Sequence, residues 1–150
     1  MMAIIQPLTA ANLSALIQLE NECFVGGWSQ TQLVRQLEHP RGISLGIFAP
    51  DLVGFILLST LLDEAELLQI AVDSQHRGEG LGQQLLAACM PLLEEQQIKR
   101  LMLEVRESNL AARSLYNSFG FIEDGRRKGY YVSLESPTVR EDALLLSLML

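Results

Sequence analysis

The stretch LLQIAVDSQHRGEGLGQQLL, residues 67–86, runs from an apolar segment through a glycine-rich segment into leucines at helical spacing. Its first residues alternate so that apolar side chains fall on both faces of an extended strand, which is typical of a central, covered strand. The expected faces are Leu68, Ile70 and Val72 on one side and Leu67, Gln69 and Ala71 on the other. A strand, a tight loop and a helix in this order predict a fold of the α/β or α+β class.

The glycine-rich loop is the first candidate site. Glycines at positions 78, 80 and 82 let the backbone approach a phosphate closely, and the amides at a helix N-terminus bind anions. The loop is not a P-loop, because no GK[ST] follows, and Gln83 stands where GxGxxG requires a third glycine. What remains is the pattern R-x-x-G-x-G from Arg77 to Gly82. It indicates an anion-binding loop, and the alternative interpretation is an ordinary glycine-rich turn before a helix. The expected buried stripe of that helix is Leu81, Leu85, Leu86, Cys89, Leu92 and Leu93.

The flanking sequence extends this unit in both directions. Thr9 and Ser29 are helix N-cap signals, and Gln32 follows Ser29 at the spacing of a capping box. A further helix is expected from Ser108 or Asn109 to Phe119. Strands are expected at 3–6, 43–48, 52–62, 64–73, 99–106, 121–127 and 139–149. Because the chain has 150 residues and no linker, we expect one domain over residues 1–150, a mixed sheet with helices on both faces.

Composition limits the classes of partner. Hydrophobic residues make up 49% of the chain and charged residues 19%, a balance that can build a core and argues against disorder. The formal net charge of −7 makes the protein a poor general binder of nucleic acid. Cys23 and Cys89 lie far apart and only two histidines are present, which disfavours disulfide, zinc and redox sites. We expect both cysteines in the core, no metal, and a cytoplasmic protein that contacts no membrane, because no leader or spanning segment is apparent.

Two further residues are candidates for chemistry. Glu104 falls on the polar face of the 99–106 strand, and a carboxylate in a central strand needs a partner or a task. Pairing with Arg106 or Arg113 is the alternative explanation for Glu104. Tyr116, taken from its position alone, is a core residue whose hydroxyl reaches water or a carbonyl. Asn109 is most simply a helix cap.

Together these motifs resemble those of GNAT-type N-acetyltransferases. Within that superfamily they resemble the RimI-type enzymes, which acetylate the N-terminal alanine of a small-subunit ribosomal protein. The resemblance is carried by LDEAELLQIAVDSQHRGEGLGQQLL (62–86), LMLEVRESNLAARSLYNSFGF (101–121), RRKGYY (126–131) and REDA (140–143). The first third fits more loosely, through Glu20, Phe24 and Trp28-Ser29. The resemblance implies a mostly antiparallel GNAT-like sheet of six to seven strands with about four helices, acetyl-CoA as cosubstrate, and a protein N-terminus as acceptor.

The resemblance also implies residue roles. The backbone of Ile70, Ala71 and Val72 would bind the acetyl group and the pantetheine arm. The pyrophosphate loop would be Arg77, Gly78, Glu79, Gly80, Leu81, Gly82 and Gln83, with Asn109 as a further contact to coenzyme A. Glu104 would be the general base, directly or through a water, and Tyr116 the general acid. A base is needed because an α-ammonium group with a pKa of about 8 must lose a proton before it attacks a thioester.

The acceptor side is less fixed by these motifs. The candidates are Trp28, Glu64, Tyr130 and Tyr131, the tyrosines being expected in the last hairpin loop. The acidic run 63–66 can attract a cationic N-terminus, although it and the basic run 126–128 are most simply solvated turns. Three features depart from the family pattern: Gly27 in place of a frequent proline, an extra residue within 126–131, and the loop 133–138. Two alternatives stay open, a GNAT enzyme for small amines or lysine side chains and a non-catalytic acyl-CoA-binding module.

Overall fold

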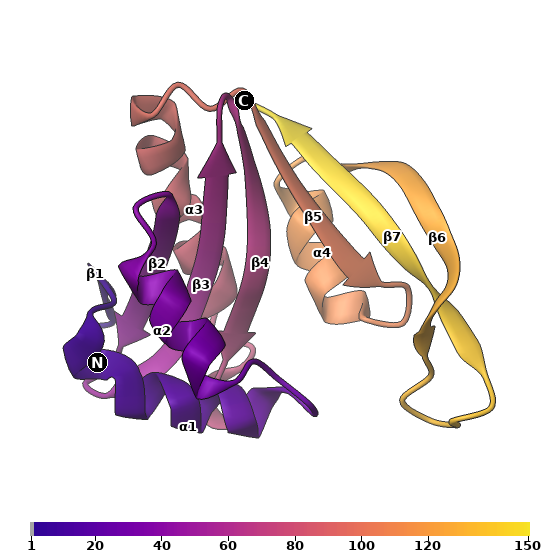
Figure 1. Cartoon of the computed structure of the whole chain (residues 1–150), viewed down its shortest axis with the longest axis horizontal. Helices are drawn as coiled ribbons and strands as arrows, with labels where there is room; N and C mark the ends of the chain where they lie inside the picture. The colour runs from indigo at the N-terminus through magenta and orange to yellow at the C-terminus, as the bar shows by residue number, and fades with distance from the viewer. Residues whose placement is uncertain (1) are drawn as a thin grey trace.

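The computed structural model describes residues 2–150 and contains one seven-stranded sheet flanked by four α-helices (Figure 1). The strands lie in the order β1-β2-β3-β4-β5-β7-β6, and every neighbouring pair is antiparallel except β4–β5. The strands are β1 (Ile4–Pro7), β2 (Gly42–Phe48), β3 (Leu52–Leu61), β4 (Glu64–Val72), β5 (Arg100–Arg106), β6 (Ile122–Val132) and β7 (Arg140–Met149). The helices are α1 (Leu13–Cys23), α2 (Gln30–Glu38), α3 (Leu81–Glu95) and α4 (Leu110–Ser118). The predicted mixed, mostly antiparallel sheet is confirmed.

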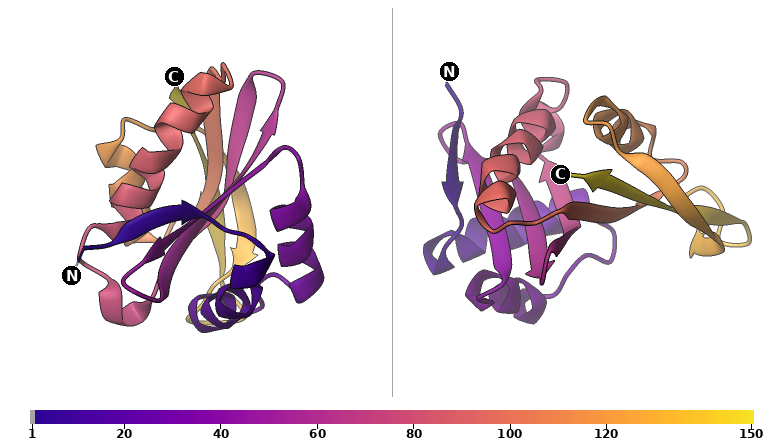
Figure 2. Two further views of the ribbon diagram at one scale, coloured as in Figure 1. Left: turned by 90° about the vertical axis from the view of Figure 1, so that its left-hand side faces the viewer. Right: turned by 90° about the horizontal axis from the view of Figure 1, so that it is seen from above.

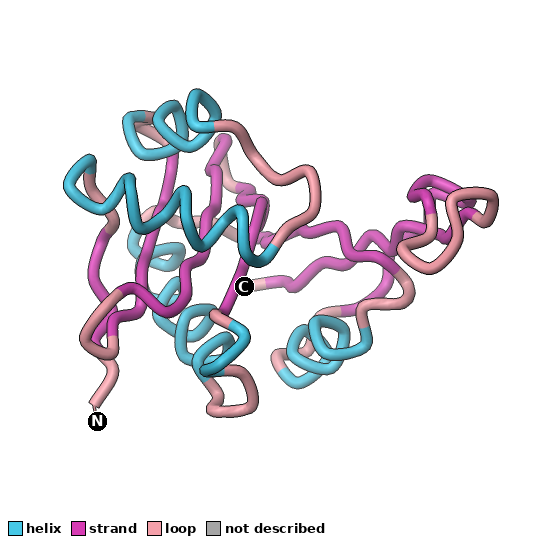
Figure 3. Tube along the Cα trace, turned by 90° about the horizontal axis from the view of Figure 1, so that it is seen from below, coloured by secondary structure: helices cyan, strands magenta, loops and turns pink. Residues whose placement is uncertain are grey.

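The helices cover the two faces of the sheet in pairs. Helices α1 and α2 lie on one face, and α3 and α4 lie on the other (Figures 2 and 3). Two apolar clusters match these layers: one joins Leu16 and Leu33 to Phe55, and the other joins Leu85 and Leu93 of α3 to the opposite side of the sheet. Because the glycine loop directly precedes α3, it lies on the side of the sheet that α3 and α4 cover.

Local signals fix most helix starts. Ser29 caps α2 through a hydrogen bond from the Gln32 backbone N–H, and the Gln32 side chain accepts from the Ser29 N–H, which confirms the predicted capping box. Thr9 caps as predicted, but it caps a 3₁₀ turn (Ala10–Asn12) that precedes α1. Cys89 lies in the core as expected, whereas Cys23 is half-buried and its Sγ lies 3.7 Å from the Val72 carbonyl oxygen. No helix in the described part, residues 2–150, is long and apolar enough to cross a membrane.

A β-bulge corrects the predicted faces of β4. Leu57 pairs with Gln69 and Leu58 with Leu67, so Leu68 is an extra residue in the ladder. Leu68 therefore packs with the cluster under α1, and Leu67 packs with Ile70 and Val72 under α3. Strict alternation predicted the reverse for both leucines, because a bulge adds one residue and moves every later side chain to the other face.

Strand β6 runs five residues further than expected. Arg127 pairs with Ala143 and Tyr131 with Glu141, so residues 128–130 bulge opposite Asp142 alone. Gly129 adopts a positive φ of 58° in this bulge, and its N–H donates to the Asp142 carboxylate at 3.0 Å. The tyrosines 130 and 131 thus lie in a strand, and the prediction of a loop there is wrong. Lys128 and Gly129 do not favour a strand, so the sequence did not indicate that β6 continues past them. The hydrogen bond from Gly129 to Asp142, 13 residues away, stabilises this part of the strand.

The two charged runs are mostly exposed, as predicted, but lie mostly in strands. Asp63 is in the turn between β3 and β4, whereas Glu64 and Glu66 are in β4 and the basic run 126–128 is in β6. Glu64 begins β4 and forms an ion pair with Arg100 at 3.3 Å. Arg126 lies in β6, where it pairs with three carboxylates, those of Glu107, Glu123 and Asp142. Opposite charges on neighbouring strands offset the cost of placing these side chains in the sheet.

Candidate active site

The parallel strands β4 and β5 separate soon after they meet. Their pairing covers only Glu64 to Glu66 on β4 and Arg100 to Met102 on β5. Beyond these residues the strands diverge, and the opening widens toward Val72 and Arg106 (Figure 1). Backbone groups on facing edges of a splayed pair are free to bond to a ligand, since they have no ladder partner. The opening is therefore the place where the sheet itself can hold a substrate.

The glycine loop lies at the open end of β4. Gly78 and Gly80 have φ angles of 78° and 79°, a conformation that favours glycine, and α3 begins directly after Gly80 with no side-chain cap. A Cβ atom built on either glycine meets nothing within 4 Å, so the space beside the loop is open. The first-turn amides of α3 and the positive end of its dipole can meet an anion there.

A pocket of about 470 Å³ joins this loop to α4. Seven predicted cofactor residues line it: Val72, Arg77, Gly78, Gly80, Leu81, Gly82 and Gln83. The sequence prediction missed five others: His76, Ala111, Ser114, Leu115 and Ser118. The four from α4 recur at helical spacing, a signal that would have found them once α4 was known to face α3.

The other predicted cofactor residues lie outside that lining. Ile70 points to the α3 side of β4, and Ala71 is buried on the opposite side. Glu79 is exposed between the two glycines. The Asn109 side chain accepts a hydrogen bond from the Ala112 N–H at 3.2 Å, which makes it the N-cap of α4. Arg77 donates from Nε to the Val72 carbonyl oxygen at 3.1 Å, which ties the loop to the end of β4.

Glu104 lies on β5 facing away from α3 and α4. Leu103 and Val105, its neighbours in the strand, are buried in the cluster on the α3 side. The hydroxyl of Tyr131 donates to Glu104 Oε1 at 3.1 Å. The alternative pairing with arginine is wrong, because Arg106 binds Glu141 and Arg113 donates to the Glu107 carbonyl oxygen. Glu104 is thus a carboxylate on the open strand with one neutral partner.

Tyr131 is the centre of a side-chain group beside Glu104. The Arg106 guanidinium lies 4.2 Å from the centroid of the Tyr131 ring, and the Tyr130 ring meets it edge-on at 5.1 Å. Burial, together with the nearby Glu104 carboxylate, raises the pKa of Tyr131 to about 12. The phenol therefore keeps its proton and remains a donor to Glu104 throughout the neutral range.

Tyr116 lies on α4, on the other face of the sheet. Its side chain is buried and packs against Phe121 with the ring centroids 5.6 Å apart. Burial raises the pKa of Tyr116 to about 12. Its chain neighbour Leu115 lines the pocket with the glycine loop. The fold therefore places the two catalytic candidates on opposite faces, with Tyr116 on the loop side and Glu104 on the side of the α1–α2 connection.

The remaining acceptor candidates are spread over three places. Trp28 lies in the α1–α2 connection, and its backbone N–H donates to Glu20 Oε1 at 2.7 Å. Tyr130 and Tyr131 lie in β6, where Tyr131 donates to Glu104 and Tyr130 packs against Tyr131. Glu64 lies at the closed end of the β4–β5 pair in its ion pair with Arg100. The structure thus brings Tyr131 to Glu104, with Tyr130 beside it, and leaves Glu64 apart from them.

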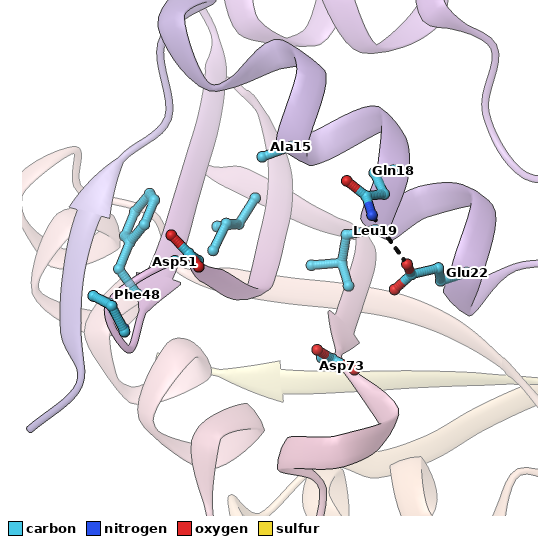
Figure 4. Close-up of a pocket in the computed structure, with 9 residues that line it drawn as sticks. Ala15, Gln18, Leu19, Glu22, Phe48, Asp51 and Asp73 are labelled. Carbon is cyan, nitrogen blue, oxygen red and sulfur yellow. Dashed lines mark hydrogen bonds between the residues drawn. The ribbon is translucent and has the colours of Figure 1, made fainter. Parts of the chain in front are cut away.

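A second cavity lies under α1, and its residue Asp73 directly follows Val72 of the glycine-loop pocket. It has a volume of about 550 Å³ and is formed by α1, the β2–β3 turn and Asp73 (Figure 4). Gln18 and Glu22 on its α1 wall are joined by a hydrogen bond of 3.4 Å. Within residues 2–150 no group of three or more His, Cys, Asp or Glu side chains is arranged to hold a metal ion.

Comparison with known proteins decides the family. Residues 13–121 match the model of the acetyltransferase (GNAT) family. The chain belongs to that family. As a GNAT protein it is an acetyl-CoA-dependent N-acetyltransferase, which confirms the predicted fold, enzyme class and cosubstrate.

Several relatives of this GNAT chain carry the same name. A [ribosomal protein bS18]-alanine N-acetyltransferase of Salmonella typhimurium is 35% identical over 142 residues, which are 94% of this chain and 93% of the relative. One from Haemophilus ducreyi is 32% identical over 97% of this chain and 99% of the relative. The crystal structure of the ribosomal-protein-S18-alanine N-acetyltransferase from Escherichia coli superposes with a TM-score of 0.90 at 33% identity, covering 99% of this chain and 94% of that one. These are RimI-type enzymes, so the resemblance within the superfamily is confirmed.

Proposed function

We propose that this GNAT enzyme transfers the acetyl group of acetyl-CoA to the N-terminal α-amine of a protein. The acceptor we propose is the N-terminal alanine of a small-subunit ribosomal protein. The observation that carries this proposal is the 35% identity to a bS18-alanine N-acetyltransferase over 93% of that relative's length. A match over nearly the whole length includes the α1–α2 connection and the β6–β7 hairpin, whose Tyr131 donates to Glu104.

The pocket at the glycine loop fits the proposed cosubstrate. Acetyl-CoA supplies an activated acyl group as a thioester and carries a pyrophosphate. Open space beside Gly78 and Gly80, together with the uncapped first turn of α3, provides backbone donors for those phosphates. Val72 and Gly82 extend the same lining toward the open edge of β4. Backbone N–H groups on that edge can stabilise negative charge on a carbonyl oxygen.

The two catalytic candidates have complementary positions for this reaction. Glu104 faces the acceptor side and accepts the proton that an α-ammonium, with a pKa of about 8, must lose. Tyr116 is buried on the same face as the glycine-loop pocket, next to the lining residue Leu115, and in this proposal its hydroxyl donates a proton at the departing sulfur. Because burial raises the pKa of Tyr116 to about 12, it acts first as a hydrogen-bond donor to that sulfur. No enzyme nucleophile is required, since the amine attacks directly.

The acceptor specificity is tested with three substrates. We expect release of coenzyme A with a peptide that has a free N-terminal alanine, and none with the same peptide blocked at its N-terminus but carrying a free lysine. Glu104→Gln should lower kcat about 10²–10⁴-fold with acetyl-CoA affinity retained. Turnover of the blocked peptide, or of a small amine at a higher kcat/KM, would contradict the proposal. Binding of acetyl-CoA without turnover of any acceptor would favour a non-catalytic module.

A further inference from the structure

Glu20 is a buried carboxylate with no role in the function described so far. It lies on α1 and is 0% exposed. Its Oε1 accepts two hydrogen bonds, from the Trp28 backbone N–H at 2.7 Å and from Gln69 Nε2 at 2.8 Å. Within residues 2–150, neither its Oε2 nor the Oε1 of Gln69 has a hydrogen-bond partner, although both atoms are buried. A buried carboxylate that is only half bonded is a poor source of stability, so its geometry calls for another explanation.

The three residues join two segments that border the β4–β5 opening. Trp28 belongs to the connection between α1 and α2, which reaches toward the opening on the face opposite α3 and α4 (Figure 3). Gln69 lies in β4 directly before Ile70. The bulge at Leu68 is what turns the Gln69 side chain to the α1 side, where it reaches Glu20. We call Glu20, Trp28 and Gln69 the Glu20 clamp.

Phe24 and Trp28 at the two ends of the connection pack against the apolar cluster under α1, whereas the tip between them has no such packing. Val25 is 99% exposed, and Gly26 adopts a φ of 66° at the tip. A Cβ atom on Gly27 would lie 2.6 Å from Glu20 Oε1, so the backbone rests directly on the carboxylate. Gly27 is also the position where the family pattern often has proline. The close approach shows that this chain fits its connection to Glu20 by omitting a side chain.

We propose that Glu20 is a positioning residue for acceptor binding. By bonding Trp28 and Gln69 at once, it fixes the distance between the α1–α2 connection and β4, and so shapes the wall against which an acceptor N-terminus lies. The hydrogen-bond geometry carries this role and the negative charge does not. The proposal rests on the proposed function, because the acceptor must enter from the face that holds Glu104.

Kinetics on two Glu20 variants test the proposal. Glu20→Ala removes both hydrogen bonds, and we expect the KM for the acceptor peptide to rise at least tenfold while the affinity for acetyl-CoA changes less than twofold. Glu20→Gln retains an oxygen for both donors, and we expect it to restore the acceptor KM to within threefold of wild type. An acceptor KM in Glu20→Ala equal to wild type, or one that stays high in Glu20→Gln, would overturn the proposal. Gln18→Ala, on the same helix, is the matched control and should change neither constant.

A second measurement does not need activity. Trp28 is the only tryptophan, so quenching of its fluorescence by acrylamide reports the position of the connection. We expect quenching to rise in Glu20→Ala and in Gln69→Met, and to stay at the wild-type level in Glu20→Gln and Gln18→Ala. Unchanged quenching in both disruptive variants would refute the clamp even if no acceptor is turned over. Gln69→Met also serves if Glu20→Ala fails to fold, because it leaves α1 intact and removes one arm.

Discussion

The proposed function gives the β4–β5 opening a cofactor side and an acceptor side, and different chemical groups form the two. On the cofactor side, glycines with positive φ and an uncapped helix start present backbone N–H groups. On the acceptor side, side chains from distant segments meet, as Glu104 does with Tyr131 and Glu20 with Gln69. Every residue except proline has a backbone N–H, so a phosphate site depends mainly on the path of the chain. A wall of paired side chains needs each partner in place.

The largest effect expected from a change on the cofactor face is on catalysis. Tyr116→Phe should lower kcat about 100-fold, because it removes the donor for the departing sulfur while the ring still fills the same buried site. Steady-state kinetics and calorimetric titration with acetyl-CoA would measure the two effects separately. A loss of acetyl-CoA affinity as large as the loss of kcat would show that the hydroxyl serves binding and not catalysis.

A change in the backbone of the glycine loop should affect only the binding of acetyl-CoA. Gly80→Val forces a β-branched residue into a φ of 79°, at a cost of about 1–2 kcal/mol, so the affinity for acetyl-CoA should fall about tenfold. The acceptor KM should stay near wild type, because the loop and Glu104 lie on opposite faces of the sheet. Gly125→Ala is the control, since Gly125 has no positive φ and a Cβ there meets its nearest atom at 3.8 Å.

A change of a side chain on the face that holds Glu104 should affect only the reaction with the acceptor peptide. Tyr131→Phe removes the hydroxyl that donates to Glu104. Loss of this hydrogen bond, about 1 kcal/mol, should lower kcat/KM for the peptide about fivefold. Acetyl-CoA affinity measured by titration should not change. If the variant instead weakens acetyl-CoA binding and leaves the acceptor unaffected, the division between the two faces is wrong.

The smallest expected effect concerns the hairpin that carries Tyr131. The Gly129 N–H, and then Arg126, lower the pKa of Asp142 below its usual value of 3.8. A carboxyl with a lowered folded-state pKa stabilises the fold above its unfolded pKa and loses that contribution as pH falls through the folded value. Asp142→Asn should therefore show a smaller drop in melting temperature than wild type between pH 5 and pH 3. An equal drop in melting temperature in wild type and Asp142→Asn would show that the charge of Asp142 contributes nothing to stability.

Sequence patterns predicted the local structure around the glycine loop better than the structure around Glu104. The order of elements, the glycine loop and the capping box at Ser29 follow from local rules, because each depends on residues a few positions apart. The bulge at Leu68 and the extension of β6 to Val132 depend on partner strands, so alternation and glycine placement misled the prediction there. The partner of Glu104 was out of reach for the same reason: Tyr131 is 27 residues away and its strand was expected to end earlier.

The short pairing of β4 with β5 has a mechanical consequence. Strand β4 pairs with β5 through three residue pairs, next to a hydrogen bond from the Lys99 N–H to the Asp63 carbonyl oxygen. This short contact joins a larger part of the sheet, β1–β4, to a smaller part, β5–β7. A ligand whose amides bond to the free edges supplies the missing rungs and becomes a temporary part of the sheet. Binding of such a ligand would then also strengthen the contact between the two parts of the sheet. A ligand at 100 times its Kd would add about 2.7 kcal/mol to the free energy of unfolding, so the protein is more stable with ligand bound than without it.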